Sequence, residues 1–444
     1  MRARIGWIAL AMLAASPARA GPLLDKALAY DARMQAVHLP GHGCRVEVRW
    51  ADDALTVPEV YFDLGDASEW TAGYIVAESL RYAVTGDPQA KANGLRSLGC
   101  LLLLERATPK IGYIARFVAP DEGPYAPSFA GECASGHCGY VESGPLAGER
   151  WIGDTSSDMY IGWWYGMLFA WDYLLDSPAE APLRAEVRAA TARVLETLRA
   201  VGYLIVNPDG GVSGSGPEIV GNERIAFHLA AAAIHGGAYA EELPKVYAEN
   251  LFAYAFSTWA PITRWYQYYA FLLGAHLQHM LLAAETSWPL LRMHRDLTRR
   301  NFHLPTRDTG QVEFDYISWG ERADKPTPER LAAAKRTLQE FPSPPRLKIH
   351  PDQGPWTPDP TIALINTLGP LLAPLFGGEW KPLAPQALDP FPMSRRCVVA
   401  NYWERSPYGV CDPAESDPRV EYPGHDYLEA YWMGRYYGFL TEED

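Results

Sequence analysis

Two kinds of helical pattern alternate along the chain. Some segments are apolar on nearly every face, whereas the segments between them carry one charged face. The all-round apolar segments are 154–175, 221–235, 264–284 and a last one after residue 424. The one-faced segments are 22–36, 179–201, 239–255 and 288–301. An all-round apolar helix is buried, and a one-faced helix lies at the surface. The pattern therefore predicts an all-α fold with inner and outer helices.

The rest of the chain adds helices and little β-structure. Further helices are expected at 67–84, 88–105 and 328–339, and short strands at 46–50 and 398–403. Alternation with period 2 is scarce, which disfavours a mainly β or a parallel α/β fold. Proline and glycine make 117–150 and 304–360 long irregular loops. Loops of that length inside a compact domain are usually functional, and we expect one domain over 21–444.

Polar residues gather where the buried segments begin. The run 153–158 reads Gly-Asp-Thr-Ser-Ser-Asp, and either Asp154 or Thr155 is predicted to cap the helix that follows. Asp158 lies one turn after Asp154, on the same face. A shorter echo precedes the helix at 67–84, where Asp66 and Glu69 stand. One cap does not need this many acids, so the pattern favours a functional site.

The N-terminus and the charge restrict where the protein acts. Residues 1–20 have the form of a secretory signal peptide, with Arg2 and Arg4, an apolar run and an Ala18-Arg19-Ala20 cleavage site. The net charge is −14, and removing Arg2, Arg4 and Arg19 lowers it to −17. Such a surface repels nucleic acids and anionic membranes. We expect a periplasmic or secreted protein without stable membrane insertion, whose partner is a neutral or cationic small molecule or carbohydrate.

Six cysteines in an oxidising compartment indicate disulfides. Fifteen connectivities are possible, and proximity favours Cys133–Cys138 and Cys397–Cys411, which leaves Cys44–Cys100. No C-x-x-C or Cys/His zinc spacing is present. The pair His276 and His279, without a nearby acid in sequence, is a weak metal signal. No metal and no cofactor is therefore predicted.

The alternation of helices and the acidic helix starts, such as Gly-Asp-Thr-Ser-Ser-Asp at 153–158, resemble the (α/α)6 toroid of six-hairpin glycosidase-like proteins. The resemblance covers most of residues 60–444 and includes glycoside hydrolases and polysaccharide lyases. It implies a cleft at one end of a helical barrel, lined by the starts of the inner helices. The acids that it would bring towards this end are Asp66, Glu69, Asp154, Asp158, Glu223 and Asp426.

The first functional hypothesis is glycoside hydrolysis by two carboxyl groups, one as acid and one as base or nucleophile. Asp158 and Glu69 are the predicted pair, and Asp154 is a third catalytic candidate that orients the substrate. Aromatic side chains near the helix starts would stack on sugar rings. The predicted substrate-binding residues are Asp66, Trp70, Trp151, Tyr160, Arg116, Glu223, His228, Tyr268, His276 and Asp426.

Two alternatives stay open. A polysaccharide lyase would use a Tyr or His base, such as Tyr268, His228 or His276, and Arg116 to neutralise the uronate. The acidic composition argues against an anionic substrate. The other alternative is an isomerase or dehydratase acting on small apolar molecules, or a non-catalytic ligand-binding protein.

Overall fold

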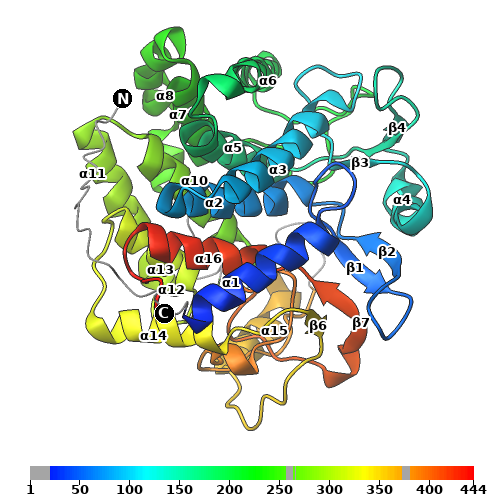
Figure 1. Ribbon diagram of the computed structural model, residues 1–444. Helices are drawn as coiled ribbons and strands as arrows, with labels where there is room; N and C mark the ends of the chain where they lie inside the picture. Colours follow the sequence, from blue (N-terminus) through cyan, green and yellow to red (C-terminus); the bar gives the residue numbers. More distant parts are fainter. Residues whose placement is uncertain (1–20, 257–263, 266, 373–380) are drawn as a thin grey trace, which may run out of the picture.

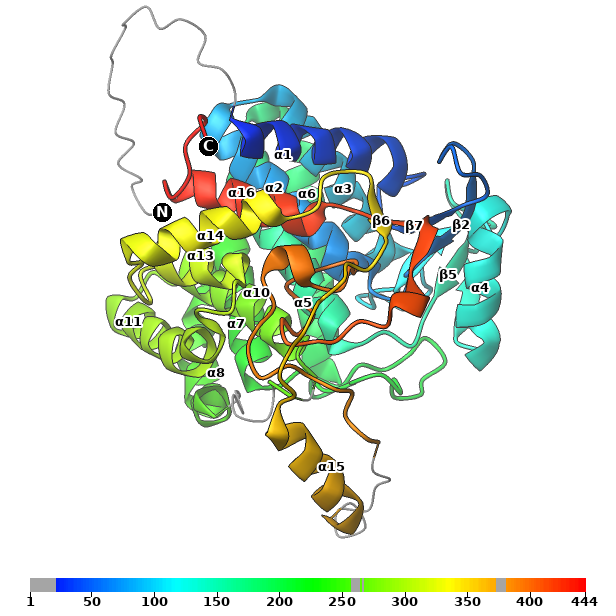
Figure 2. The same ribbon diagram turned by 90° about the horizontal axis from the view of Figure 1, so that it is seen from below.

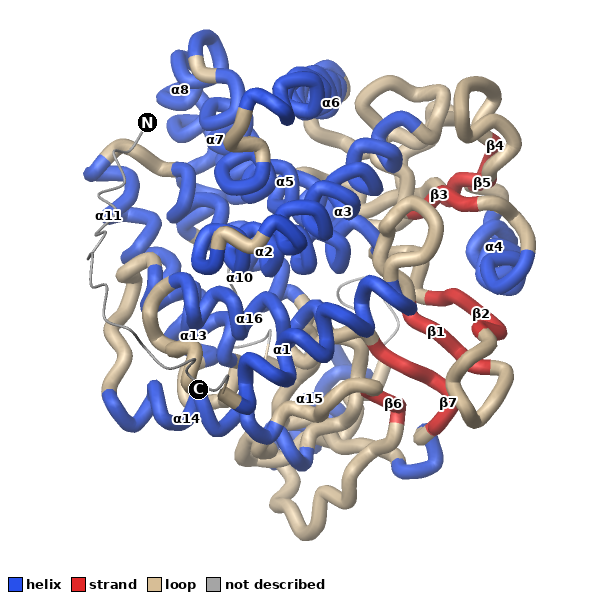
Figure 3. The backbone as a smooth tube through the Cα atoms, viewed as in Figure 1, coloured by secondary structure: helices blue, strands red, loops and turns tan. Residues whose placement is uncertain are grey.

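The computed structural model describes residues 21–256, 264–265, 267–372 and 381–444. The predicted signal peptide at 1–20 lies outside the described residues. Helices make up most of the described chain, and strands are confined to two small sheets (Figure 3). None of the described helices is both long enough and apolar enough to cross a bilayer.

Six helices are buried on nearly every side, because their sequences are apolar all round. These helices are α2 (Ala67–Thr85), α5 (Ser157–Phe169), α7 (Gly221–His235), α10 (Ala270–Ala284), α13 (Val312–Gly320) and α16 (His425–Tyr436). Each contacts the next in the chain, and α16 contacts α2 (Figure 1). Their apolar side chains form one large hydrophobic core.

Helices with an exposed charged face alternate with the buried ones along the chain. They are α1 (Pro22–Arg33), α3 (Pro88–Arg106), α6 (Ala181–Ala200), α8 (Gly237–Ala255), α11 (Trp288–Leu297) and α14 (Pro328–Glu340). The short helices are α4 (Ala126–Glu132) and α12 (Leu304–Thr306). Helix α15 (Pro360–Leu372) projects away from the body of the molecule (Figure 2). The predicted alternation of buried and half-exposed helices is confirmed.

Both sheets are antiparallel. The first has the order β2-β1-β7-β6, and the second has the order β3-β5-β4. The strands of the first are β1 (Glu47–Trp50), β2 (Pro58–Phe62), β6 (Arg346–Lys348) and β7 (Asp417–Tyr422). Those of the second are β3 (Phe117–Ala119), β4 (Cys138–Tyr140) and β5 (Arg150–Ile152). The second sheet begins in the predicted irregular region 117–150, and its strand β5, which ends at Ile152, leads into α5.

Three local predictions were wrong. Residues 398–403 form turns rather than a strand. The predicted loop 304–360 contains the buried helix α13, because a short apolar run is helical despite the prolines on either side. The helix expected from residue 264 begins only at Ala270.

The predicted N-cap of α5 was also wrong. Ser156 occupies the cap position in an extended conformation, and no side chain caps the helix. Asp154 stands two residues earlier with a left-handed φ of 51°. Its carboxylate is turned to a neighbouring loop instead of to the helix, as described below.

The three disulfides have the connectivity that proximity favoured. Cys44 pairs with Cys100, Cys133 with Cys138, and Cys397 with Cys411. The described residues contain no free cysteine. The Cys44–Cys100 bond joins the segment before β1 to the buried side of α3, and therefore fixes the N-terminal region to the helical core.

We predict that the Cys44–Cys100 disulfide stabilises the fold more than the Cys133–Cys138 disulfide, because it encloses a longer loop. Cys44 and Cys100 are 56 residues apart, whereas Cys133 and Cys138 are 5 apart. Replacing the first pair by alanine should lower the free energy of unfolding by about 4 kcal/mol, and replacing the second by about 2 kcal/mol, because the longer loop gains more entropy on unfolding. Chemical denaturation measures both losses. Equal losses would contradict the loop-length account.

Candidate active site

A cavity of about 250 Å³ lies where three buried helices begin. Its walls come from the start of α2, the start of α5, the start of α10 and the segment after residue 400. The residues that line it are Asp66, Glu69, Trp70, Asp158, Tyr269, Leu272, Leu273 and Glu404. Four of the eight are acids. Helix N-termini stabilise carboxylates through the helix dipole, so the first turns of α2 and α5 suit Glu69 and Asp158.

A glycine brings the two acidic helix starts together. A Cβ atom on Gly162 would lie 2.3 Å from the Cα of Glu69. Only glycine therefore allows α5 to approach α2 this closely. Ser68 of α2 also donates a hydrogen bond to the carbonyl of Met159 in α5. The sequence thus places Glu69 and Asp158, the predicted catalytic pair, on the wall of one cavity.

The carboxyl groups of the cavity hold their protons more tightly than free carboxylic acids. Burial and Asp63 raise the pKa of Asp66 to about 6, and Asp158 adds to this effect. Burial also raises the pKa of Glu404 to about 7. The pKa of Asp158 is raised by burial, but a hydrogen bond from Ser157 and the charge of Arg116 oppose the rise. The cavity therefore offers carboxyl groups in both protonation states near neutral pH.

Arg116 ties the two helix starts together. Its Nε donates to the carbonyl of Asp154 at 2.9 Å, and its Nη1 donates to the carbonyl of Gly65 at 2.7 Å. Nη1 also lies 3.3 Å from Oδ1 of Asp66. Because the guanidinium is used in this way, Arg116 acts on the cavity as a nearby positive charge and does not line it.

Asp154 does not line the cavity. Its carboxylate accepts hydrogen bonds from the loop that precedes α7, and the donors are Asn207, Ser213, Gly214 and Ser215. Although burial opposes the change, these bonds lower the pKa of Asp154 to about 2. The residue predicted as a third catalytic acid therefore latches the 207–215 loop to the start of α5.

His276 lies directly behind the cavity wall. Its Nδ1 is 2.7 Å from Oε1 of Glu69, and its Nε2 is 3.1 Å from Oε1 of Glu313 and 3.7 Å from Oε1 of Glu429. Tyr165 donates to the same oxygen of Glu429 at 2.9 Å. His276, Glu313 and Glu429 present ligand atoms that all lie within 4.8 Å of one another. This group could hold a metal ion.

His279, the second histidine of the predicted pair, is not part of this group. Its Nδ1 lies 2.8 Å from the hydroxyl of Tyr165, and its Nε2 lies 3.0 Å from the hydroxyl of Tyr437. Burial lowers the pKa of His279 to about 3. It is therefore a neutral ring between two hydroxyl groups.

Trp70 supplies the aromatic wall of the cavity. The Trp70 indole is 6% exposed, and its N–H has no hydrogen-bond partner within the described structure. The ring packs against Arg45 and His425 and lines the cavity as an aromatic wall. Tyr269, Leu272 and Leu273 complete the wall from α10.

The other predicted substrate-binding residues lie outside the cavity lining. Trp151 is in β5, where it packs on Gly139. Tyr160 is buried in the core behind the start of α5. Asp426 forms a fully buried ion pair with Arg346, 2.8 Å apart. This ion pair explains the acid at the start of α16. The resemblance to helical barrels had predicted that Asp426 would lie with the other acids at one end of the fold.

Glu223, His228 and Tyr268 also have structural partners. Oε2 of Glu223 accepts from the backbone N–H of Val220 at 2.8 Å, and burial raises its pKa to about 8. Nε2 of His228 lies 2.7 Å from the hydroxyl of Tyr203. The hydroxyl of Tyr268 accepts from Gln311. Of these three, only Glu223 influences the cavity, because it interacts with the charge of Asp158.

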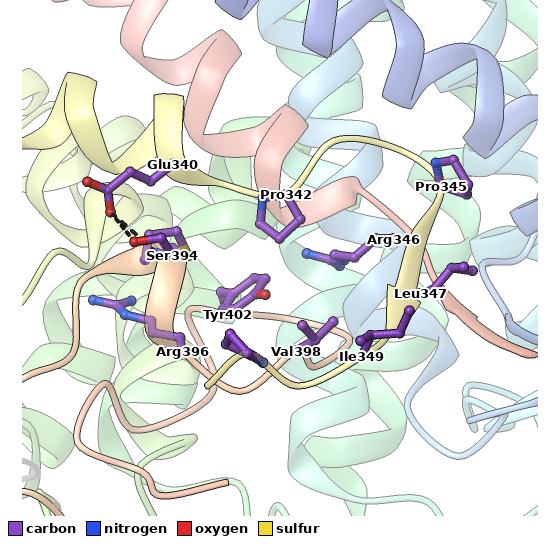
Figure 4. A pocket seen from close by; sticks show the side chains of 12 residues that line it. Glu340, Pro342, Pro345, Arg346, Leu347, Ile349, Ser394, Arg396, Val398 and Tyr402 are labelled. Atoms are coloured by element: carbon purple, nitrogen blue, oxygen red, sulfur yellow. Dashed lines mark hydrogen bonds between the residues drawn. The ribbon is translucent and has the colours of Figure 1, made fainter. Parts of the chain in front are cut away.

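A larger cavity, of about 370 Å³, lies between the segment after α14 and residues 393–402 (Figure 4). Its charged side chains are already paired. Glu340 accepts from Ser394, Arg346 pairs with Asp426, and Arg396 donates to Gln311 and to backbone carbonyls. Size alone would favour this cavity. The smaller one is the better candidate, because its acids have shifted pKa values and lie at helix starts.

Sequence reasoning missed three acids that the structure brings to this region. Glu404 lies in an irregular segment, where no periodic pattern marks it. Glu313 and Glu429 are inside helices that are buried on nearly every side. Such an acid needs a partner when it is buried, and this signal could have identified both residues.

Comparisons with protein-family models, with curated proteins and with solved structures found no match to this chain.

We predict that Asp154 stabilises its loop through its carboxylate. Replacing Asp154 by alanine should speed hydrogen exchange of the Gly214 amide by about tenfold or more, because a charge-assisted hydrogen bond is lost. Asn at this position tolerates a left-handed φ and keeps one acceptor oxygen but lacks the charge, so Asp154→Asn should give an exchange rate between those of the wild type and Asp154→Ala. Because the pKa is depressed to about 2, the loop should be stable above the ordinary carboxyl pKa and loosen as the pH falls towards 2. Exchange in Asp154→Ala as slow as in the wild type would rule out the latch.

Proposed function

We propose that the helices form an (α/α)6 toroid. Six buried helices contact one another in succession, the last contacts the first, and half-exposed helices alternate with them along the chain. In such a barrel the starts of α2 and α5 lie at the same end, and this agrees with their joint contribution to one cavity. The three disulfides and the signal-peptide pattern support a secreted or periplasmic location.

We infer that the cavity is the active site of a glycoside hydrolase. The observation that carries this proposal is the gathering of Asp66, Glu69, Asp158 and Glu404 around one small cavity with an indole wall. Glycoside hydrolysis needs one protonated and one ionised carboxyl group on either side of the scissile bond.

Both carboxyl groups have a raised pKa, and the surroundings of each divide the catalytic roles. Glu404 has a pKa of about 7. A large fraction of this carboxyl group is therefore protonated near neutral pH and can act as the general acid. Asp158 receives a hydrogen bond from Ser157 and feels the charge of Arg116, and both favour the ionised form that a base or nucleophile needs. Glu69 is held by His276 and positions the substrate between them.

The cavity favours a neutral substrate. Its volume is close to the lower limit for small-molecule sites, so it suits a terminal sugar unit rather than a long polymer. A uronate would need a positive partner, and no Lys or Arg is among the described residues that line the cavity. Tyr268 and His228, the candidate bases of a lyase, lie outside the lining. These observations favour hydrolysis over β-elimination.

The variant Asp158→Asn tests the proposed base. It should lower the hydrolysis of neutral oligosaccharides, measured as new reducing ends, by about 10²- to 10⁴-fold, the usual range for a general acid or base. The melting temperature should change little, because within the described chain the side chain forms a single hydrogen bond to another side chain, that of Ser157. Asp154→Asn is the matched control and should retain activity. A large drop in melting temperature with Asp158→Asn would instead identify Asp158 as structural.

The pH dependence tests Glu404. Its raised pKa means that the protonated acid is abundant below about pH 7 and is lost above it, so the rate should fall about tenfold per pH unit on the alkaline side. Glu404→Gln should abolish this alkaline limb. It should also retain activity on aryl glycosides, whose leaving groups need no proton. An alkaline limb that persists in Glu404→Gln would contradict the assignment.

A further inference from the structure

The ionisable cluster behind the cavity contains more negative than positive charge. Glu69, Glu313 and Glu429 come from three different helices, and each is at most 1% exposed, as is His276. Within the described chain, no Lys or Arg forms an ion pair with these carboxyl groups, and His276 is their shared partner. One imidazolium can balance only one carboxylate. Ionised carboxylates without a partner are strongly disfavoured in a protein interior.

The geometry of the cluster is that of a metal-binding group. Donor atoms bound to one ion at about 2.0–2.2 Å lie roughly 3–4 Å apart. The Nε2 atom of His276 is 3.1 Å from Glu313 and 3.7 Å from Glu429. The opposite ring nitrogen faces Glu69 at 2.7 Å. A carboxylate on the outer nitrogen of a histidine fixes the tautomer that leaves the inner nitrogen free for a metal.

An independent observation also points to a ligand. Oε2 of Glu313 is fully buried and has no hydrogen-bond partner within the described structure. A buried acceptor of this kind is costly when it is unsatisfied. Gly73 leaves space for the carboxylate of Glu429, because a Cβ atom at residue 73 would lie 2.7 Å from Oε2 of Glu429. A cation between the two carboxylates would satisfy both the orphaned oxygen and the excess charge.

We propose that His276, Glu313 and Glu429 bind one divalent transition-metal ion, with zinc as the best match to one imidazole and two carboxylates. Imidazole nitrogen and carboxylate oxygen are common zinc ligands. The hydroxyl of Tyr165 supports the site by donating to Glu429. Bound there, the ion fixes His276 and, through it, Glu69 on the cavity wall. The proposal does not depend on the reaction that takes place in the cavity.

Metal analysis of the full mature protein, purified without a histidine tag, tests the site. We expect about one zinc ion per chain, and Glu313→Gln should lose it. The matched control is Glu223→Gln, which replaces another buried carboxyl and should retain the metal. Zinc in both variants at equal amounts, or in neither the wild type nor the variants, would count against the site.

A second measurement remains decisive if Glu313→Gln does not fold. Wild-type protein treated with a chelator is titrated with Zn²⁺ by calorimetry and followed by thermal unfolding, then titrated with Co²⁺ by visible absorption. We expect saturation at one equivalent, a melting temperature several degrees higher, and a cobalt spectrum typical of nitrogen and oxygen ligands. Absence of binding in both titrations would overturn the proposal and mean that protons neutralise the cluster.

Discussion

Carboxyl groups buried where helices meet are the constraint on which the rest of this structure depends. Asp66, Glu69, Asp158 and Glu404 surround one cavity, and Glu313 and Glu429 lie behind it. The positive charges nearby are few, since Arg116 is held between the two helix starts and His276 is shared by three carboxylates. A hydrophobic core would not retain so many acids for stability alone. Protons, substrate or an ion would complete the charge balance.

We expect the excess negative charge to be compensated in one way at the cavity and in another way in the core behind it. At the cavity, Asp66 and Glu404 have pKa values of about 6 and 7, so protons neutralise part of the charge near neutral pH. Protons on carboxyl groups beside a cavity are available for chemistry. In the core, Glu313 is fully buried and has an orphaned oxygen, and the cation that we propose there would compensate its charge. Glu69 joins the two ends through His276.

Much of the fold could be predicted from the sequence. Helices that are apolar all round, such as α5 and α7, reveal their burial directly in the pattern. Helix α13 could not be predicted because it is short and prolines stand on both sides of it. The disulfide pairing followed from proximity. The prediction of the α5 cap failed because the amides that donate to Asp154 come from residues 207–215. Contacts between segments distant in the sequence leave no local pattern.

The candidate site was predictable only in part. The acids of the two helix starts, Glu69 and Asp158, share a cavity because both follow the same Gly-Asp pattern and because Gly162 lets the helices approach. Glu404 and Tyr269 reach the cavity through the tertiary fold, which the sequence pattern does not encode locally. Asp426 was placed at this end on the same helix-start argument, but Arg346 draws it into a buried ion pair.

One measurement tests the central claim most directly. The purified mature protein is incubated with a panel of neutral oligosaccharides and uronate-containing polysaccharides, while new reducing ends and the ultraviolet absorbance of unsaturated uronates are followed together. The account predicts new reducing ends from a neutral substrate without any rise in absorbance. A rise in absorbance would mean β-elimination, and would contradict the assignment of Asp158 and Glu404 as a hydrolytic pair.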